Sequence, residues 1–201
     1  MIMRELFGAL LNQLNLLRTK GMLVIVVAGV VAIVGYLINR GEVFYFAAMF
    51  VFLFLIPVCM LNTTSVSFGS KWVHFERLWG ISQTVLILSR YVVYVLVSLA
   101  ISGLWMLSPL YDGNPSNIVL GLVMVLLTGA FYYPVMYFLN SGENEGLGAV
   151  VIIFAFVIAS FVLVPLVNLD WLMVFGILSG LHVVSLALSV IFDKFHFGRR
   201  L

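Results

Sequence analysis

The strongest constraint on this chain is a series of long segments that contain no Asp, Glu, Lys or Arg. They cover residues 21–38, 43–61, 91–107, 118–139, 147–167 and 171–192. Each is close in length to the roughly 20 apolar residues that one helical crossing of a bilayer requires. Backbone groups in hydrocarbon must pair within their own segment, so continuous apolar runs of this length predict helices. We therefore expect an all-α membrane protein with six transmembrane helices.

The composition points to the same class. Hydrophobic residues make up 64% of the chain, charged residues make up 9%, and the mean hydropathy is +1.21. Soluble domains are close to half apolar and a quarter charged. The segments are continuous apolar runs without the alternation of barrel strands. We expect a single transmembrane domain over residues 1–201.

The basic residues predict how the chain is oriented. With six spans, both termini share one side of the membrane with the loops at 62–90 and 140–146. Of the ten Lys and Arg residues, only Arg40 lies on the other side. Basic residues concentrate on the cytoplasmic side of membrane proteins. We expect both termini in the cytoplasm, and a multi-pass protein of a cytoplasmic membrane.

Residues 1–20 have a different pattern from the spans. Apolar residues recur there at helical spacing, with polar residues on the other side: Met3, Leu6, Phe7, Leu10, Leu11, Leu14 and Leu17 against Arg4, Glu5, Asn12, Gln13 and Asn15. This pattern predicts an amphipathic helix that lies in the membrane interface. It serves either as an anchor for the first span or as a site for a partner.

The spans carry little chemistry of their own. Among acidic, basic and histidine side chains, only His182 lies within the expected spans. It is either a hydrogen-bonded packing residue or part of a proton relay. The pairs His74/Glu76 and Asp193/His196 lack the further ligands of a metal site. No phosphate-binding loop is present. We expect a protein that is not an enzyme, binds no metal or cofactor and, with a net charge of +2, binds no nucleic acid.

The segment between the second and third spans, residues 62–90, is the most polar part of the chain. Within it, Trp72, Phe75, Leu78 and Trp79 recur at three- and four-residue spacing among Lys71, His74, Glu76 and Arg77. Such a short helix either rests on the membrane surface through its aromatic residues or docks into a groove of a soluble partner. The pattern alone does not separate these two interpretations.

Residues 79–91, WGISQTVLILSRY, resemble a signature of small ABC-2 type permeases. The family pattern is Leu-Pro-Val-Ser-Arg-x-x-Ile-Val-x-Ser-Lys-Tyr, and Ser82 and Ser89-Arg90-Tyr91 stand at its serine and at its Ser-Lys-Tyr. Pro134-Val-Met-Tyr-Phe138 with the following 142–146 is similar to the family's ending of its fourth span. Gly80 replaces the family's proline and Gln83 its basic residue.

The resemblance implies the permease subunit of an ATP-driven exporter in a bacterial cytoplasmic membrane. In that family two membrane subunits, identical or paralogous, pair with cytosolic ATPases that bind ATP and Mg. A coupling helix in the first cytoplasmic loop contacts the ATPase. By position it corresponds here to residues 68–79, with Lys71, Trp72, Phe75, Glu76, Arg77 and Trp79 as the contact residues. Within that family, this sequence most resembles permeases that export phenol-soluble modulins, which are short amphipathic peptides.

The apolar spans suit such a substrate. Candidate residues of a substrate path are Phe46, Phe50, Phe54 and His182, although aromatic residues in spans more commonly pack or face lipid. Gly176 and Gly180 permit close approach of a helix, and Pro134 and Pro165 predict kinks. The alternative function is a non-transporting scaffold, immunity or sensor subunit with the same six-span layout.

Overall fold

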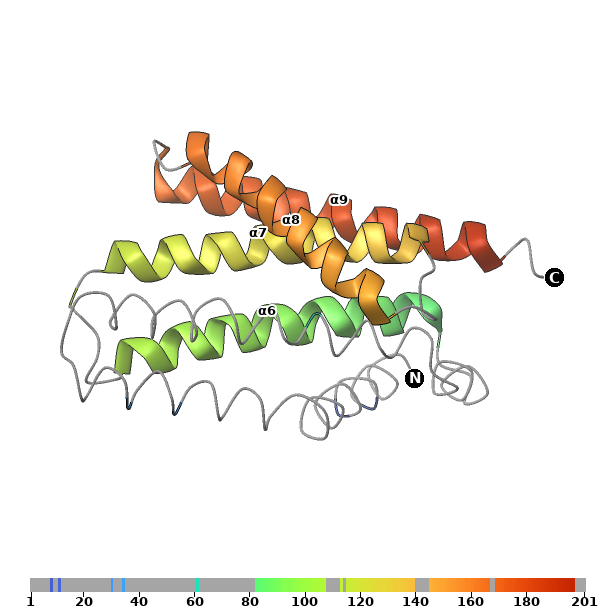
Figure 1. Cartoon of the computed structure of the whole chain (residues 1–201), viewed down its shortest axis with the longest axis horizontal. Coiled ribbons are helices and arrows are strands. Elements are labelled where there is room, and N and C mark those ends of the chain that lie inside the picture. Colours follow the sequence, from blue (N-terminus) through green and yellow to red (C-terminus); the bar gives the residue numbers. More distant parts are fainter. Residues whose placement is uncertain are drawn as a thin grey trace.

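The fold is known from a computed structural model, in which the described residues are 8, 11, 30, 34, 61, 82–107, 113, 115–139, 145–166 and 169–197. They form four long helices: α6 (Gln83–Leu107), α7 (Pro115–Leu139), α8 (Glu145–Leu166) and α9 (Trp171–Phe197). Consecutive helices run in opposite directions (Figure 1). The described part of the chain is therefore all-α.

Three of these helices are long and apolar enough to cross a membrane. They are Gln83–Leu107, Pro115–Leu139 and, within α9, Trp171–Phe195, each of 25 residues. At 1.5 Å per residue each is about 37 Å long, which exceeds the roughly 30 Å of a bilayer core. Helix α8 holds a shorter apolar stretch, Val150–Leu163. The chain is a multi-pass membrane protein.

The observed helix bounds correct one boundary in the sequence interpretation. Helix α6 begins at Gln83 and not at Tyr91, so the last part of the segment 62–90, expected as a loop, is helical. Ser82 caps this start, because its hydroxyl accepts a hydrogen bond from the amide of Val85 at 3.3 Å. The charge of Arg90 predicts a span boundary at this residue, yet Arg90 lies inside the candidate span.

The other expected elements fall in two groups. Residues 118–139, 147–167 and 171–192 correspond to α7, α8 and α9, and α9 continues to Phe197. The expected spans 21–38 and 43–61, the interfacial helix 1–20 and the coupling segment 68–79 lie outside the described residues, apart from single helical residues at 8, 11, 30, 34 and 61.

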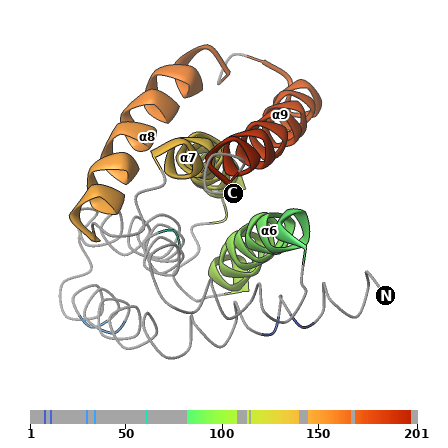
Figure 2. The ribbon, with the colours of Figure 1, turned by 90° about the vertical axis from the view of Figure 1, so that its right-hand side faces the viewer.

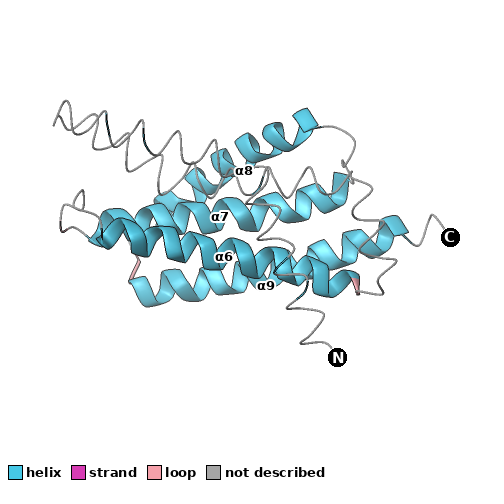
Figure 3. Ribbon diagram, turned by 90° about the horizontal axis from the view of Figure 1, so that it is seen from below, coloured by secondary structure: helices cyan, strands magenta, loops and turns pink. Residues whose placement is uncertain are grey.

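Helix α7 lies at the centre of the described bundle. Figure 2, seen along the helices, places α6, α8 and α9 around it, and α8 crosses it obliquely in Figures 1 and 3. Within the most apolar window of each helix, 67% of the residues are buried in α7 against 22% in α9. Helix α7 therefore supplies the surface on which the other described helices pack.

Gly129 allows α6 to approach α7 closely. A Cβ at this position would overlap the ring of Tyr94, which is buried on α6. The hydroxyl of Tyr94 then reaches the carbonyl oxygen of Val125 at 2.6 Å, one helical turn before Gly129. A small residue on α7 and a phenol on α6 thus fix this contact together.

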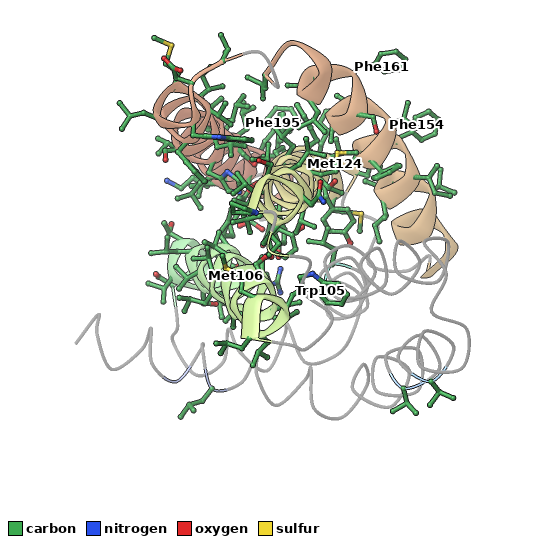
Figure 4. All side chains as sticks on the ribbon, turned by 90° about the vertical axis from the view of Figure 1, so that its left-hand side faces the viewer. Trp105, Met106, Met124, Phe154, Phe161 and Phe195 are labelled. Atoms are coloured by element: carbon green, nitrogen blue, oxygen red, sulfur yellow. The ribbon has the colours of Figure 1, made fainter. Side chains whose placement is uncertain are left out.

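Large apolar side chains cover the outside of the described bundle. Phe154 and Phe161 project from α8 away from the other helices (Figure 4), and 65% and 76% of their surfaces are exposed. Leu172 at the start of α9 is 88% exposed. Apolar surface on this scale is unusual for a soluble protein and matches contact with lipid.

Candidate functional site

Arg90 brings a positive charge into the interior of the bundle. Its side chain is 4% exposed, and Nη1 donates a hydrogen bond of 2.8 Å to the hydroxyl of Tyr137 on α7. The guanidinium carbon lies 5.9 Å from the centre of the Tyr137 ring, within the range of a cation–π contact. Buried charges inside membrane spans are expensive and mark functional sites. Arg90 therefore marks a candidate functional site near the N-terminal end of α6 and the C-terminal end of α7.

Pro134 creates a second polar feature close by. A proline inside a helix has no N–H, so the carbonyl of the residue four positions earlier, Ala130, loses its usual partner. The hydroxyl of Ser185 on α9 donates a hydrogen bond of 2.6 Å to that carbonyl oxygen. Helix α9 thus pairs a backbone group that the proline in α7 would otherwise leave unpaired in an apolar environment.

Tyr91 extends this pairing to α6. Its hydroxyl lies 2.6 Å from Oγ of Ser185 and 2.9 Å from Oγ of Ser189. Because Ser185 gives its single proton to the Ala130 carbonyl, Tyr91 donates to Ser185 and Ser189 donates to Tyr91. The chain of hydrogen bonds Ser189–Tyr91–Ser185–Ala130, which we call the hydroxyl network, joins α6, α7 and α9.

Aromatic rings surround the hydroxyl network. Tyr133 lies at their centre, with ring centroids 4.4 Å from Tyr91, 5.6 Å from Tyr132 and 6.0 Å from Tyr94. The last two contacts are edge-to-face, an arrangement that aromatic pairs prefer. The hydroxyl of Tyr132 donates to the carbonyl oxygen of Leu61 at 2.9 Å, which ties the cluster to the second expected span.

An open groove of about 380 Å³ continues from Tyr91 along α6 and α9, with Leu126 of α7 beneath it. Its lining is almost entirely apolar: Tyr91, Val92, Val95, Leu96, Leu126, Phe175, Leu178, Ser179, His182, Val183 and Leu186. Leu96 on one side is 57% exposed and Val183 on the other is 67% exposed, so the groove opens to the outside of the described bundle. Its volume lies within the range of small-molecule pockets.

His182 is the most polar side chain of the groove. Its Nδ1 lies 2.9 Å from the carbonyl oxygen of Leu178, and its ring meets the Tyr91 ring edge-on with centroids 6.4 Å apart. Nε2 is buried and has no hydrogen-bond partner among the described residues. The walls of the groove are thus apolar, with polar side chains only at Tyr91, Ser179 and His182.

The structure places only one of the residues singled out from the sequence as site candidates. His182 lies in the groove, as just described. The candidate path residues Phe46, Phe50 and Phe54 lie outside the described residues. So do the candidate coupling residues, which are Lys71, Trp72, Phe75, Glu76, Arg77 and Trp79. Among the described residues, no group of three or more His, Cys, Asp or Glu side chains is placed to hold a metal ion.

Reasoning from sequence missed Arg90, Ser185 and Ser189 as members of a site. Arg90 is the last residue of the expected loop 62–90, and a serine on an apolar helix carries no local signal of its hydrogen-bond partner. A usable signal was present, because Pro134 predicts an unpaired carbonyl at Ala130 and so a donor on a neighbouring helix. The sequence did not say which helix would supply that donor.

Comparison of the chain with protein-family models, with curated proteins and with solved structures finds no match.

Proposed function

We propose that the chain is the permease subunit of an ATP-driven ABC exporter, moving amphipathic peptides or other hydrophobic substrates across a bacterial cytoplasmic membrane. In this proposal the chain has six spans with both termini in the cytoplasm. It pairs with a second copy or a paralogue, and a separate cytosolic ATPase binds ATP and Mg.

The observation that carries the proposal is the position of α6 between the proposed coupling segment, residues 68–79, and the apolar groove. Helix α6 begins at Gln83, four residues after the last proposed coupling residue, Trp79. Its second and third turns hold Arg90 and Tyr91, which bond to α7 and α9. Tyr91 also forms one end of the groove. A movement at the start of α6 would therefore reach the groove through direct contacts.

The lack of carboxylates in the described lining of the groove, where His182 is the one residue of the acidic, basic or histidine type, favours an external energy source. The groove residues include no Asp, Glu, Lys or Arg. A transporter driven by protons or sodium would place a carboxylate in its path. Energy from a partner ATPase, delivered through the segment 68–79, agrees with this lining.

The test is purification of the chain from its native membrane together with any bound ATPase, followed by reconstitution of the pair. We expect hydrolysis of ATP to depend on the chain. Glu76→Ala and Phe75→Ala should weaken association with the ATPase while the helical content is retained. Ser65→Ala, outside the coupling segment, is the matched control and should associate normally.

If both the Glu76→Ala and the Phe75→Ala variants assemble with the ATPase and support hydrolysis normally, the proposed coupling role of residues 68–79 is wrong. A chain that binds no ATPase and whose loss leaves export of hydrophobic peptides intact would instead be a scaffold, immunity or sensor subunit. These two outcomes are separate, since the first concerns one segment and the second concerns the function as a whole.

A further inference from the structure

Ser185 uses its hydroxyl differently from other hydroxyl residues of the described helices. Four of those donate a hydrogen bond of 2.7–2.9 Å to the carbonyl oxygen four residues earlier in their own helix: Ser98, Thr128, Ser160 and Ser179. Serine and threonine commonly bond in this way inside helices. Ser185 instead donates to Ala130 of a neighbouring helix, at 2.6 Å. Its proton thus serves α7 and not α9.

A second acceptor for the Ser185 hydroxyl lies within α9 itself. The residue four positions earlier is Leu181, and α9 is helical over both residues. A carbonyl oxygen has two lone pairs, so that of Leu181 can accept this hydroxyl in addition to the amide of Ser185. Rotation of the side chain between staggered rotamers would move the proton from Ala130 to Leu181. Two discrete hydrogen-bonded positions are therefore open to Ser185.

The bond from Ser185 to Ala130 lies at the weakest point of α7. Helices bend at internal prolines, because the proline removes one backbone hydrogen bond and crowds the preceding turn. Helix α7 nevertheless continues through Pro134 to Leu139. Ser185 supplies from α9 the hydrogen bond that Pro134 removes from Ala130. The continuity of α7 past the proline thus depends on a side chain of another helix.

Two neighbouring residues of α6 hold the two sides of this weak point. Tyr91 bonds to Ser185 and through it reaches Ala130, which lies before the proline. Arg90 donates to Tyr137, which lies after the proline. All these side chains that bond across helices are buried. A change in the tilt of α6 would withdraw the Tyr91 hydroxyl from Ser185 and pull on Tyr137 at the same time.

We propose that Ser185 is a releasable latch on a hinge at Pro134, and that Tyr91 holds the latch shut. In the closed state, which the structure shows, Ser185 donates to Ala130 and α7 is one continuous helix. When α6 tilts and withdraws Tyr91, Ser185 turns to Leu181 and the part of α7 beyond the proline bends. The same latch would operate in a permease or in a sensor subunit.

The experiment measures amide hydrogen exchange of the full chain in lipid nanodiscs, read by mass spectrometry. Exchange of a helix amide requires local opening, so its rate follows the population of opened states. The amides of residues 135–139, beyond the proline, report the hinge. Those of residues 118–127 report the part of α7 before it.

Release of the latch should accelerate exchange only beyond the hinge. Ser185→Ala should raise the exchange rate of residues 135–139 about tenfold or more, because it leaves a buried carbonyl unpaired in the closed state. Tyr91→Phe should raise this rate about threefold to tenfold, the range of two hydrogen bonds between membrane helices. Pro134→Ala added to Ser185→Ala should make exchange slow again, since residue 134 then donates to Ala130 within α7.

Two matched controls remove hydroxyl groups away from the latch. Ser179→Ala changes the same residue type on the same helix, but Ser179 donates within α9. Tyr94→Phe changes the same residue type on α6 and removes a bond to Val125, which lies on α7 before the proline. Neither control should change exchange at residues 135–139.

Unchanged exchange at residues 135–139 in Ser185→Ala, or an equal rise in both segments of α7, would overturn the latch. So would fast exchange that persists when Pro134→Ala is added. If Tyr91→Phe behaves like Tyr94→Phe, α6 does not hold the latch shut and the proposal is wrong. Helical content and thermal unfolding are measured for each variant. Tyr91→Phe, the smaller change, tests the proposal if Ser185→Ala does not fold.

Discussion

Helices α6 and α9 meet in two different ways along their length. Toward the end that holds Arg90, the contact is closed by hydroxyl groups, with Tyr91 bonded to Ser185 and Ser189. Toward the other end the same helices diverge into the apolar groove that contains His182. Hydroxyl contacts thus hold the two helices together at one end, whereas the apolar part of their contact leaves an open groove.

The largest effect is expected where α6 is fixed to α7 beside the closed region. Gly129→Ala would place a methyl group into the Tyr94 ring, and overpacking of a buried site costs about 1–3 kcal/mol. We expect a loss of stability in the upper part of this range, measured by unfolding in mixed detergent micelles. Gly103→Ala is the control, because a Cβ there meets no atom within 4 Å. Equal stability of the two variants would contradict the close contact.

The next effect concerns the carbonyl that Pro134 leaves unpaired. Ser185→Ala should cost about 1–3 kcal/mol, because it leaves the Ala130 carbonyl without its donor. Pro134→Ala restores an N–H to α7, so Ser185→Ala should cost less in that background. A double-mutant cycle on unfolding free energies measures this difference. A coupling energy of zero would show that Ser185 does not compensate for the proline.

A smaller effect is expected at Tyr91. Tyr91→Phe removes the bonds to both serines but keeps the ring and the Ser185–Ala130 bond. Hydrogen bonds between membrane helices average about 0.6 kcal/mol, so we expect a loss of about 1 kcal/mol. Ser189→Ala should add little in the Tyr91→Phe background, and full additivity of the two changes would argue against their contact.

The smallest effect is expected at the edge of the groove. Val183→Ala should change stability by less than about 0.5 kcal/mol, because this side chain is 67% exposed. The same substitution at Val123, which is 1% exposed on α7, should cost about 2 kcal/mol. Unfolding of both variants under one condition checks the pair. A large loss at Val183 would mean that the groove is part of the packed core.

Much of the described fold could be predicted from the sequence, because a continuous uncharged segment in a bilayer must pair its backbone groups internally and therefore forms a helix. The sequence pattern places the start of α6 at residue 91, later than the observed Gln83, because the charge of Arg90 indicates the end of an apolar span. Arg90 stays inside because Tyr137, forty-seven positions away, accepts its hydrogen bond, and such a partner is not readable from local pattern. Ser82 did carry a local signal, since serine is a preferred N-cap residue.

The candidate site was predicted only in part, through His182. The surroundings of His182 depend on which helices pack against α9, and the apolar periodicity of a sequence does not say which helices are neighbours. In the sequence Tyr91 belongs only to the Ser-Arg-Tyr motif, and its contact with Ser185 and Ser189 joins residues more than ninety positions apart. The proposed coupling residues at 71–79 lie outside the described part of the chain and remain a prediction.

The position of Arg90 along α6 has a consequence for how the helix moves. Arg90 lies about 10 Å from the start of a helix about 37 Å long. If α6 is centred in a core of roughly 30 Å, its Cα lies about 7 Å inside the hydrocarbon. Sliding α6 inward would carry the guanidinium further from the headgroups, which is costly. A force applied at its start would therefore change the tilt of α6 rather than push it through the membrane like a piston.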